Sequence, residues 1–172
     1  LERMARSAPA RVVTVSSAAH ALGKVTFDDL QREKRYQRWT AYGQSKLCNL
    51  LFAYELDRRL RARGLDVRSV ACHPGYASTN LQSGAARMTR ASFGELVWRW
   101  LNGLFAQSPA MGALPTLYAA AADAAQGGDF IGPGKLFATR GPPVKGRSNR
   151  RSHDEAVARQ LWEVSEKLTG VS

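Results

Sequence analysis

The sequence predicts an α/β fold built on a parallel sheet, and three segments support this prediction. Residues 11–17 form a β-branched, apolar run that is typical of a buried strand. Residues 40–63 repeat apolar side chains near the helical period, and a second apolar run at 67–72 ends at Pro74 and Gly75. A strand, a helix and a strand in this order indicate a right-handed crossover between two parallel strands.

The first strand is expected to be covered on both faces, because its apolar run is continuous rather than alternating. It ends in two small polar residues, Ser16 and Ser17, and a long polar connection leads to the helix at 40–63. Gly64 follows this helix at the position where a left-handed residue commonly ends one. The apolar stripe of the helix consists of Leu47, Leu50, Leu51, Tyr54 and Leu60.

Four further elements are expected downstream within a single domain, 1–172. They are helices at 93–105, 109–125 and 154–168 and a short edge strand within 127–134. Pro115 predicts a local break or kink in the second of these helices, because proline has no N–H to donate. Ser152 or Asp154 is expected to cap the last helix.

The composition is that of a globular intracellular protein. Hydrophobic residues make up 44% of the chain, yet no run approaches the roughly 20 apolar residues of a membrane-spanning helix. The first residues, LERMARSAPA, are polar and basic, so no secretory signal is expected and we predict a cytoplasmic location. Cys48 and Cys72 lack metal-ligand or CxxC spacing, which predicts reduced thiols and no metal site.

Much of the formal net charge of +11 lies in one Gly/Pro/Arg-rich segment, residues 134–152. Six basic residues and no acidic residue occur between Lys135 and Arg151. Such a segment can contact a polyanion, but its TRGPPVKGRSNRRS portion has no interleaved aromatic residues and matches no nucleic-acid-binding module. We therefore expect a solvated basic loop and no nucleic-acid partner.

Tyr42 and Lys46 are four residues apart in the predicted helix and therefore lie on one face of it. An ammonium group beside a phenol favours its ionised form, so the pair can serve as an acid/base centre. Taken alone, the YxxxK spacing is weak evidence, because a surface tyrosine often lies against a lysine stem. Its context adds weight, since a Ser-Ser pair and a Pro-Gly pair end the two neighbouring strands, where ligands bind in open α/β sheets.

Three motifs in this order, RVVTVSSAAHALGKVTFDDL, YGQSK and HPGYASTNL, resemble the short-chain dehydrogenase/reductase family. They are most similar to its subgroup of retinol dehydrogenases, protochlorophyllide reductases and WW-domain oxidoreductases. The resemblance is strong over 11–80 and looser beyond. It implies a doubly wound, Rossmann-type parallel sheet and an NAD(P)-dependent oxidoreductase that interconverts an alcohol and a carbonyl by hydride transfer.

The resemblance also implies a role for each matching residue. Ser17 would hydrogen-bond the substrate oxygen, with the neighbouring Ser16 as the alternative. Tyr42 would act as the general acid/base, and Lys46 would promote ionisation of Tyr42 and bind the nicotinamide ribose. The cofactor contacts that the resemblance implies are Tyr42, Lys46, Pro74, Gly75, Ala77 and Thr79. In the connection 18–39, Tyr36 and Trp39 could line a substrate entrance or simply pack.

The glycine-rich turn that binds the cofactor pyrophosphate in this family is absent, as is its NNAG stretch. We therefore expect the C-terminal half of a Rossmann-type domain without its N-terminal nucleotide-binding half, and this chain alone is expected to bind cofactor poorly. The alternative is a non-catalytic truncated product or an interaction module that retains the half-fold. The subgroup resemblance favours NADP over NAD, an apolar alcohol or carbonyl substrate, and a homo-oligomer formed through the helix of Tyr42.

Overall fold

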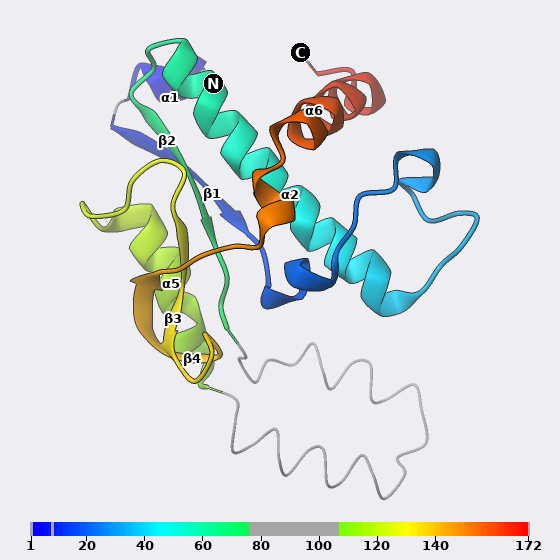
Figure 1. The fold of residues 1–172 in the computed structure, drawn as a ribbon. Helices are drawn as coiled ribbons and strands as arrows, with labels where there is room; N and C mark the ends of the chain where they lie inside the picture. The colour runs from blue at the N-terminus through cyan, green and yellow to red at the C-terminus, as the bar shows by residue number, and fades with distance from the viewer. Residues whose placement is uncertain (1, 8, 76–106, 172) are drawn as a thin grey trace, which may run out of the picture.

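The crossover predicted from the sequence is the centre of the observed fold (Figure 1). The structure is a computed structural model that describes residues 2–7, 9–75 and 107–171. Its helices and strands are α1 (Glu2–Ala5), β1 (Ala10–Val15), α2 (Arg38–Ala62), β2 (Val67–Cys72), α5 (Pro109–Ala121), β3 (Phe130–Lys135), β4 (Arg140–Lys145) and α6 (Glu155–Thr169), with short 3₁₀ helices η1 (Ala18–Leu22), η2 (Phe27–Asp29) and η3 (Arg150–His153). α2 connects β1 to β2 and the two strands pair in parallel, so the predicted α/β class is confirmed.

The sheet has the strand order β1-β2-β3-β4, in which β3 is parallel to β2 and antiparallel to β4. Two expectations are corrected here. β3 is not an edge strand, because β4 pairs with its outer side. β4 and η3 lie inside the segment 134–152, for which the sequence predicted a loop. Pro143 lies opposite Pro133 in a strand at the sheet edge, where a missing N–H is tolerated.

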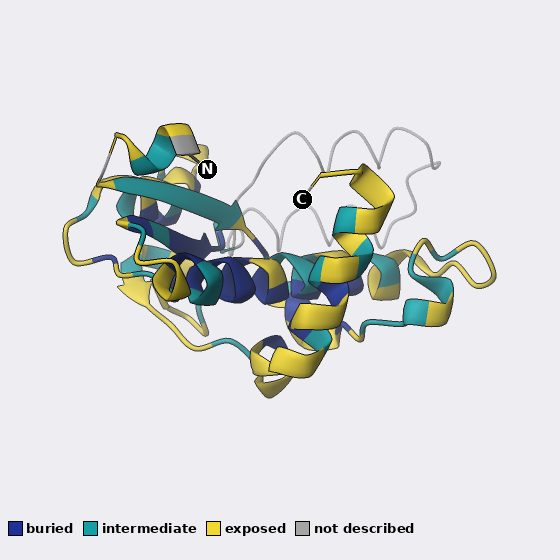
Figure 2. Ribbon diagram, turned by 90° about the horizontal axis from the view of Figure 1, so that it is seen from above, coloured by how far each residue is buried: buried dark blue, intermediate teal, exposed yellow. Residues whose placement is uncertain are grey.

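Helices cover both faces of the sheet, as a doubly wound arrangement requires. In β2, Val70 and Cys72 pack with Ala119 of α5, whereas the intervening Ala71 packs with Leu50 of α2. This division follows from the strand itself, since successive side chains point to opposite faces. Figure 2 shows the buried residues gathered in the central part of α2 and the adjoining strands, with α6 at the exposed margin. The predicted fold class is thus confirmed as a four-stranded, mostly parallel half-fold.

The ends of α2 follow from local sequence signals. The helix begins two residues earlier than predicted, and the Gln37 side chain caps it by accepting the Thr40 N–H at 2.7 Å. At the other end, Gly64 adopts a φ of 64°, the left-handed conformation expected of a residue that terminates a helix. Because both ends of α2 are fixed by these residues, the site residues near its start keep a constant distance from the core residues that pack beneath its middle.

The two later helices are found with shifted ends. α5 stops at Ala121, and it continues past the buried Pro115, so the sequence was wrong in allowing a break there. Asp154, rather than Ser152, caps α6 by accepting the N–H groups of its first turn. The helix predicted at 93–105 lies outside the described residues. Among the described helices, none has the length and apolar character needed to cross a bilayer.

Candidate active site

The carboxyl ends of β1 and β2 lie beside the first half of α2 (Figure 1). Directly after β1, the Ser16 N–H donates to the Cys72 carbonyl at 2.7 Å, which extends the parallel ladder by one residue. The Ser16 hydroxyl donates to the Lys46 carbonyl at 2.7 Å, and Asn49 Nδ2 donates to the Val15 carbonyl at 2.9 Å. These bonds fix the end of β1 to the third turn of α2.

The two candidate serines have different environments. Ser16 is 2% exposed, and its only hydroxyl proton is used by the Lys46 carbonyl. Ser17 is half-buried and caps η1, where its Oγ accepts the Ala19 N–H at 3.2 Å. A serine hydroxyl that accepts one bond still has its own proton to donate. The geometry therefore makes Ser17 the better candidate for a hydrogen bond to a substrate oxygen.

η1 packs on α2 through two glycines. A Cβ on Gly23 would lie 2.8 Å from the Gly43 carbonyl carbon and nearer still to its oxygen. A Cβ on Gly43 would lie 3.0 Å from the Ala19 carbonyl oxygen. Neither position leaves room for a side chain, so the backbones of η1 and α2 approach each other more closely than other residues would permit.

These contacts locate Ser17 relative to the predicted acid/base pair. Its neighbour Ser16 contacts α2 at Lys46, and Ala19 contacts α2 at Gly43, one turn earlier. Ser17 lies in the chain between these two contacts. It is therefore placed next to the turn of α2 that contains the YxxxK pair.

Tyr42 and Lys46 lie on one face of α2, as their spacing predicted. Lys46 Nζ is 5.5 Å from the centroid of the Tyr42 ring. Tyr42 is 40% exposed and Lys46 is half-buried, so both polar groups can reach a ligand. Across the described residues, no carboxylate pairs with Lys46. A phenol, an ammonium and a serine hydroxyl form a donor set suited to a carbonyl oxygen and to ribose hydroxyls.

The loop after β2 is held by its glycine and by a buried glutamine. Gly75 adopts a φ of 69°, and a Cβ there would lie 2.6 Å from Pro133 Cγ. Gln107 is 6% exposed; its Nε2 donates to the Pro74 carbonyl at 2.6 Å and its Oε1 accepts the Gly141 N–H at 3.2 Å. The loop is thereby joined to the β3–β4 hairpin. Two further residues predicted to contact cofactor, Ala77 and Thr79, lie outside the described residues.

Sequence reasoning did not identify Gln107, since a single glutamine before a helix matches no motif. We expect Gln107→Ala to lower the free energy of unfolding by about 1–3 kcal/mol, because it removes a buried side chain that bonds both the half-buried Pro74 carbonyl and the Gly141 N–H. The matched control is Gln126→Ala, which removes an exposed bond to the Asp123 carbonyl and should cost much less. Urea unfolding of both variants tests this, and equal losses would show that Gln107 is not a clamp.

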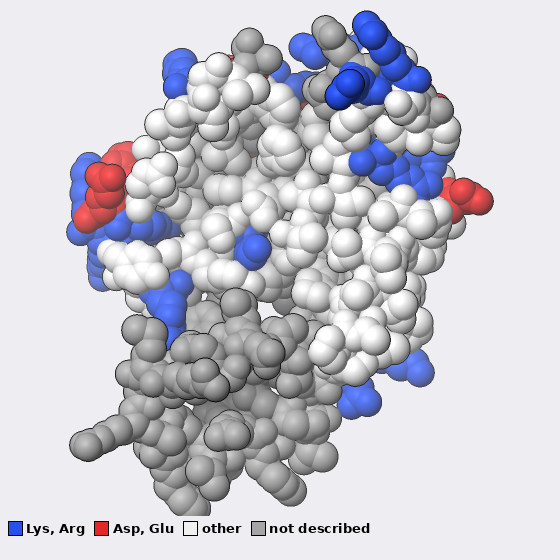
Figure 3. Space-filling view, turned by 180° about the vertical axis from the view of Figure 1, so that it is seen from behind, with Lys and Arg blue, Asp and Glu red and all other residues white. Residues whose placement is uncertain are grey.

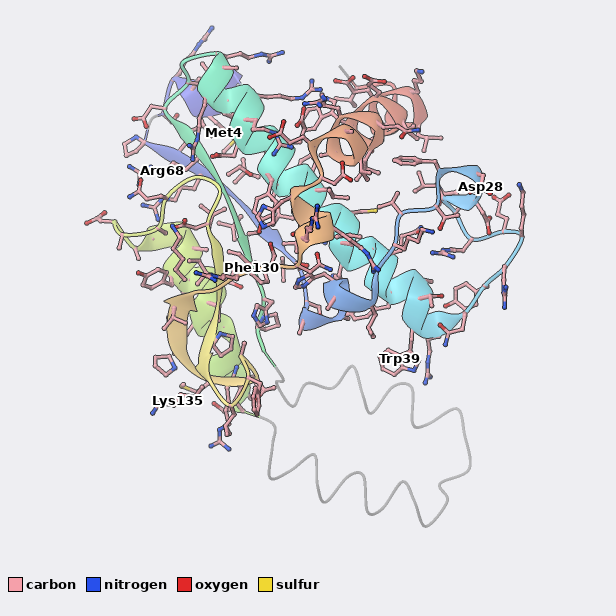
Figure 4. All side chains as sticks on the ribbon, in the orientation of Figure 1. Met4, Asp28, Trp39, Arg68, Phe130 and Lys135 are labelled. Atoms are coloured by element: carbon pink, nitrogen blue, oxygen red, sulfur yellow. The ribbon has the colours of Figure 1, made fainter. Side chains whose placement is uncertain are left out.

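Two buried histidines flank Phe130 behind the site. The ring centroids of His20 and His73 lie 5.5 Å and 5.0 Å from that of Phe130, whose central position is seen in Figure 4. His20 Nδ1 donates to the Ser17 carbonyl at 2.7 Å, and His73 Nδ1 accepts the Gly75 N–H at 3.3 Å. His20 therefore holds the backbone after β1, where Ser17 lies, and His73 holds the backbone after β2, where Gly75 lies.

Burial lowers the pKa of both histidines from the ordinary value of about 6.5. The pKa of His73 falls to about 4, mainly through burial and further through the nearby charge of His20. Both rings are thus neutral at pH 7. The neutral rings can accept as well as donate hydrogen bonds, as the two strand-end contacts require.

A depressed histidine pKa makes the fold sensitive to acid. The contribution of the neutral His73 ring to the free energy of unfolding is fully present above pH 6.5. It is lost as the pH falls toward 4, because the unfolded chain takes up the proton before the folded chain does. We expect a loss of about 3 kcal/mol across this interval. Urea unfolding of the wild type and of His73→Gln at pH 7 and pH 4 should show the variant losing less stability on acidification. Parallel losses would contradict this assignment.

The remaining candidate residues are two aromatic side chains and two cysteines. Tyr36 and Trp39 are 73% and 55% exposed, so they do not pack into the core, and Trp39 lies at the outer end of α2 in Figure 4. Burial raises the pKa of the Cys48 thiol to about 11 and also raises that of Cys72, and both are free cysteines. The described residues contain no group of three or more potential ligands that could hold a metal ion.

Comparisons with known proteins agree on one group of relatives. Human retinol dehydrogenase 11 is 37% identical over 99% of this chain, human retinol dehydrogenase 12 is 39% identical over 99%, and human retinol dehydrogenase 13 is 37% identical over 99%. A crystal structure of an uncharacterised protein from Mycobacterium paratuberculosis is 41% identical, covers 93% of this chain and superposes with a TM-score of 0.69. No protein-family model matches the chain.

The chain spans about half the length of these relatives. It covers 49% of each of the three human retinol dehydrogenases and 50% of the mycobacterial chain. The matching half is the C-terminal part of the retinol dehydrogenases. This correspondence agrees with the half-fold described above. The chain is therefore a homologue of retinol dehydrogenases 11–14 and belongs, as a counterpart of their C-terminal half, to the short-chain dehydrogenase/reductase family.

Proposed function

We propose that this chain supplies the catalytic half of an oxidoreductase that interconverts an alcohol and a carbonyl. The proposal is supported by two observations: Tyr42 and Lys46 share one face of α2, and Ser16, the residue before Ser17, donates to the Lys46 carbonyl at the carboxyl end of β1. This is the edge at which open α/β sheets bind ligands. The names of the relatives support the same class of reaction.

Each residue has a defined part in the reduction of a carbonyl. The Ser17 hydroxyl donates a hydrogen bond to the carbonyl oxygen and fixes its position. Tyr42 delivers its phenolic proton to that oxygen, and a hydride, which the nicotinamide would supply, reaches the carbonyl carbon; the two together give the alcohol. Lys46, which has no carboxylate partner in the described part of the chain, stabilises the negative charge left on the phenolate.

The donor set fits the nicotinamide end of NAD(P), with NADP favoured. A bound nicotinamide would supply or accept the hydride. Lys46 and Tyr42 would bind the ribose hydroxyls, and the Pro74–Gly75 backbone would lie along the nicotinamide side. No glycine-rich turn in this sequence offers a site for the pyrophosphate, so this chain accounts for one end of the cofactor only. We propose an apolar alcohol or carbonyl compound as substrate, the class to which retinol belongs.

A direct test compares two proteins. The first is this chain, and the second is this chain joined to the half of the Mycobacterium paratuberculosis protein that it does not match. Each is incubated with NADPH or NADH and with retinal, a long-chain aldehyde or acetaldehyde, and oxidation of the cofactor is followed by absorbance. We expect the fusion to turn over apolar aldehydes faster than acetaldehyde. A folded fusion that binds cofactor without turnover would instead support the non-catalytic alternative.

A further inference from the structure

β1 is the outermost strand of the sheet, yet it has the sequence of an interior strand. It pairs with β2 on one side, and within the described residues no strand pairs with its other side. Its sequence, ARVVTV, is mostly β-branched and contains no proline or glycine. Its one charged side chain, Arg11, turns to the end of α5, where it donates to the carbonyls of Ala119 and Ala122 at 3.2 Å and 2.8 Å. β1 therefore has neither the prolines nor the projecting charges that keep sheet edges from pairing.

The opposite edge of the same sheet is protected. β4, RGPPVK, contains Pro142 and Pro143, and its pairing with β3 has a register shift. Prolines and irregular pairing are common means of preventing an edge strand from accepting another strand. The contrast indicates that β1, rather than β4, is the edge at which the sheet continues.

The side chains of β1 are covered incompletely on both faces of the sheet. Val12 packs with the cluster under α2 and Val13 with the cluster that includes α5. The residues from Ala10 to Thr14 are only half-buried and Val15 is 41% exposed, whereas five of the six residues of β2 are buried. Figure 2 shows this difference as a teal β1 at the upper margin beside a dark blue β2. A partner at this edge must therefore cover both faces, which a single peptide strand does not do.

The open edge presents a regular row of backbone groups. The Ser16 N–H donates to the Cys72 carbonyl of β2, and successive residues of a strand direct their N–H and C=O groups to opposite sides. The groups directed away from β2 are therefore those of Arg11, Val13 and Val15. Asn49 donates to the Val15 carbonyl and so ends the row beside the candidate site.

The surface on the β1 side of the molecule is largely uncharged. In Figure 3, which views this side, the described surface is mostly white, and the Lys and Arg side chains lie mainly at its margins. The whole chain carries a formal net charge of +11. A wide uncharged area on so basic a protein is typical of a surface that a partner covers.

The relatives indicate which partner this is. The chain matches the C-terminal half of the retinol dehydrogenases, and about half of each relative has no counterpart in it. We propose that the outer edge of β1 binds the N-terminal half of a domain of this family as a separate polypeptide. Because β1, β2 and β3 are parallel, the added strand is parallel too, and the helices beside it cover both faces of β1. This inference rests on the fold and the family, and it does not depend on the proposed reaction.

A second copy of this chain fits the edge less well. Pairing of β1 with its own copy about a two-fold axis would be antiparallel, in a sheet whose first three strands are parallel. It would also bring together two chains that each carry a net charge of +11.

A cleavable fusion tests the proposal. The half of the Mycobacterium paratuberculosis protein that this chain does not match is joined to it through a protease site, and the purified fusion is cut. We expect the two pieces to remain together as a one-to-one complex in size-exclusion chromatography and native mass spectrometry. The outward amides of Arg11, Val13 and Val15 should exchange at least about tenfold more slowly in the complex than in the isolated chain. The inward amides of Val12 and Thr14, which already pair with β2, should change less.

One substitution on β1 and a matched one on β4 locate the interface. Val15→Lys should weaken the association at least about tenfold, because the partner would bury its charge. The control is Val144→Lys, which changes a valine that is 42% exposed at the opposite edge of the sheet and should leave the association unchanged. Both valines are exposed in this chain, so neither lysine should impair its folding.

Three results would each overturn the proposal. The first is that the pieces separate or precipitate after cleavage. The second is that the isolated chain is already a dimer with slowly exchanging outward amides, which would assign the edge to a second copy. The third is that Val15→Lys and Val144→Lys associate equally well with the other half. A complex that assembles but does not turn over aldehydes would contradict the proposed function and leave this inference standing.

Discussion

Replacing Tyr42 with phenylalanine in the fusion should lower kcat by about 10²- to 10⁴-fold, the range that a positioned proton donor contributes. The substitution removes one hydroxyl from a half-exposed ring and leaves the helix face unchanged. Cofactor affinity should fall little, because Lys46 still offers its ammonium to the ribose. The loss should therefore appear in turnover rather than in the binding of NADPH followed by fluorescence.

The matched control is Tyr118→Phe, which removes a hydroxyl from a half-buried tyrosine of α5, beside the core cluster of β2 and β3. We expect it to retain turnover. If Tyr42→Phe kept more than about half of the wild-type kcat, Tyr42 could not be the proton donor of the rate-limiting step. If both variants lost activity together with stability, the effect would be one of folding, and unfolding curves of each variant distinguish the two cases.

Replacing Gly23 with alanine should damage the fold near the site. Its added methyl group would lie 2.8 Å from the carbonyl carbon of Gly43 and would force η1 away from α2. Overpacking of this kind costs about 1–3 kcal/mol, and here the obstacle is backbone rather than a flexible side chain. We expect a fall in the urea midpoint and, because Ser17 is displaced from the YxxxK turn, a further fall in kcat/KM.

The control for Gly23 is Gly146→Ala. A Cβ on Gly146 would approach nothing closer than the Phe130 carbonyl oxygen at 3.6 Å, an ordinary contact distance. This substitution should change stability by less than about 0.5 kcal/mol. A Gly23→Ala protein as stable and as active as Gly146→Ala would show that the close approach of η1 to α2 can relax without cost.

The sequence allowed the fold to be predicted where local and long-range signals agreed. β2 was predicted with its observed bounds, because the apolar run 67–72 is followed by a Pro-Gly pair. α2 was predicted to within two residues at its start, since its apolar period and Gly64 both mark it. The failure was β4, because it lies in a Gly/Pro/Arg-rich segment that suggested a loop. Only pairing with β3, which is not visible from local sequence, makes it a strand.

The candidate site was less fully predictable. Spacing alone placed Tyr42 and Lys46 on one helix face, and the structure agrees. It did not distinguish Ser16 from Ser17, because that choice depends on which hydroxyl the Lys46 carbonyl uses. Gln107 could not have been found either. Its function arises from two backbone groups, at Pro74 and Gly141, that lie more than thirty positions away on each side in the chain.

The central claim is that Ser17, Tyr42 and Lys46 act on one substrate oxygen as a unit. A double-mutant cycle on kcat/KM of the fusion, using Ser17→Ala and Tyr42→Phe, tests it most directly. Residues that act as a unit are strongly non-additive, so we expect the double variant to be about as slow as the slower single variant. Ser165→Ala, which removes a hydroxyl from α6, combined with Tyr42→Phe serves as the unrelated pair. Losses for Ser17 and Tyr42 that multiply fully, or an unaffected Ser17→Ala, would contradict the account.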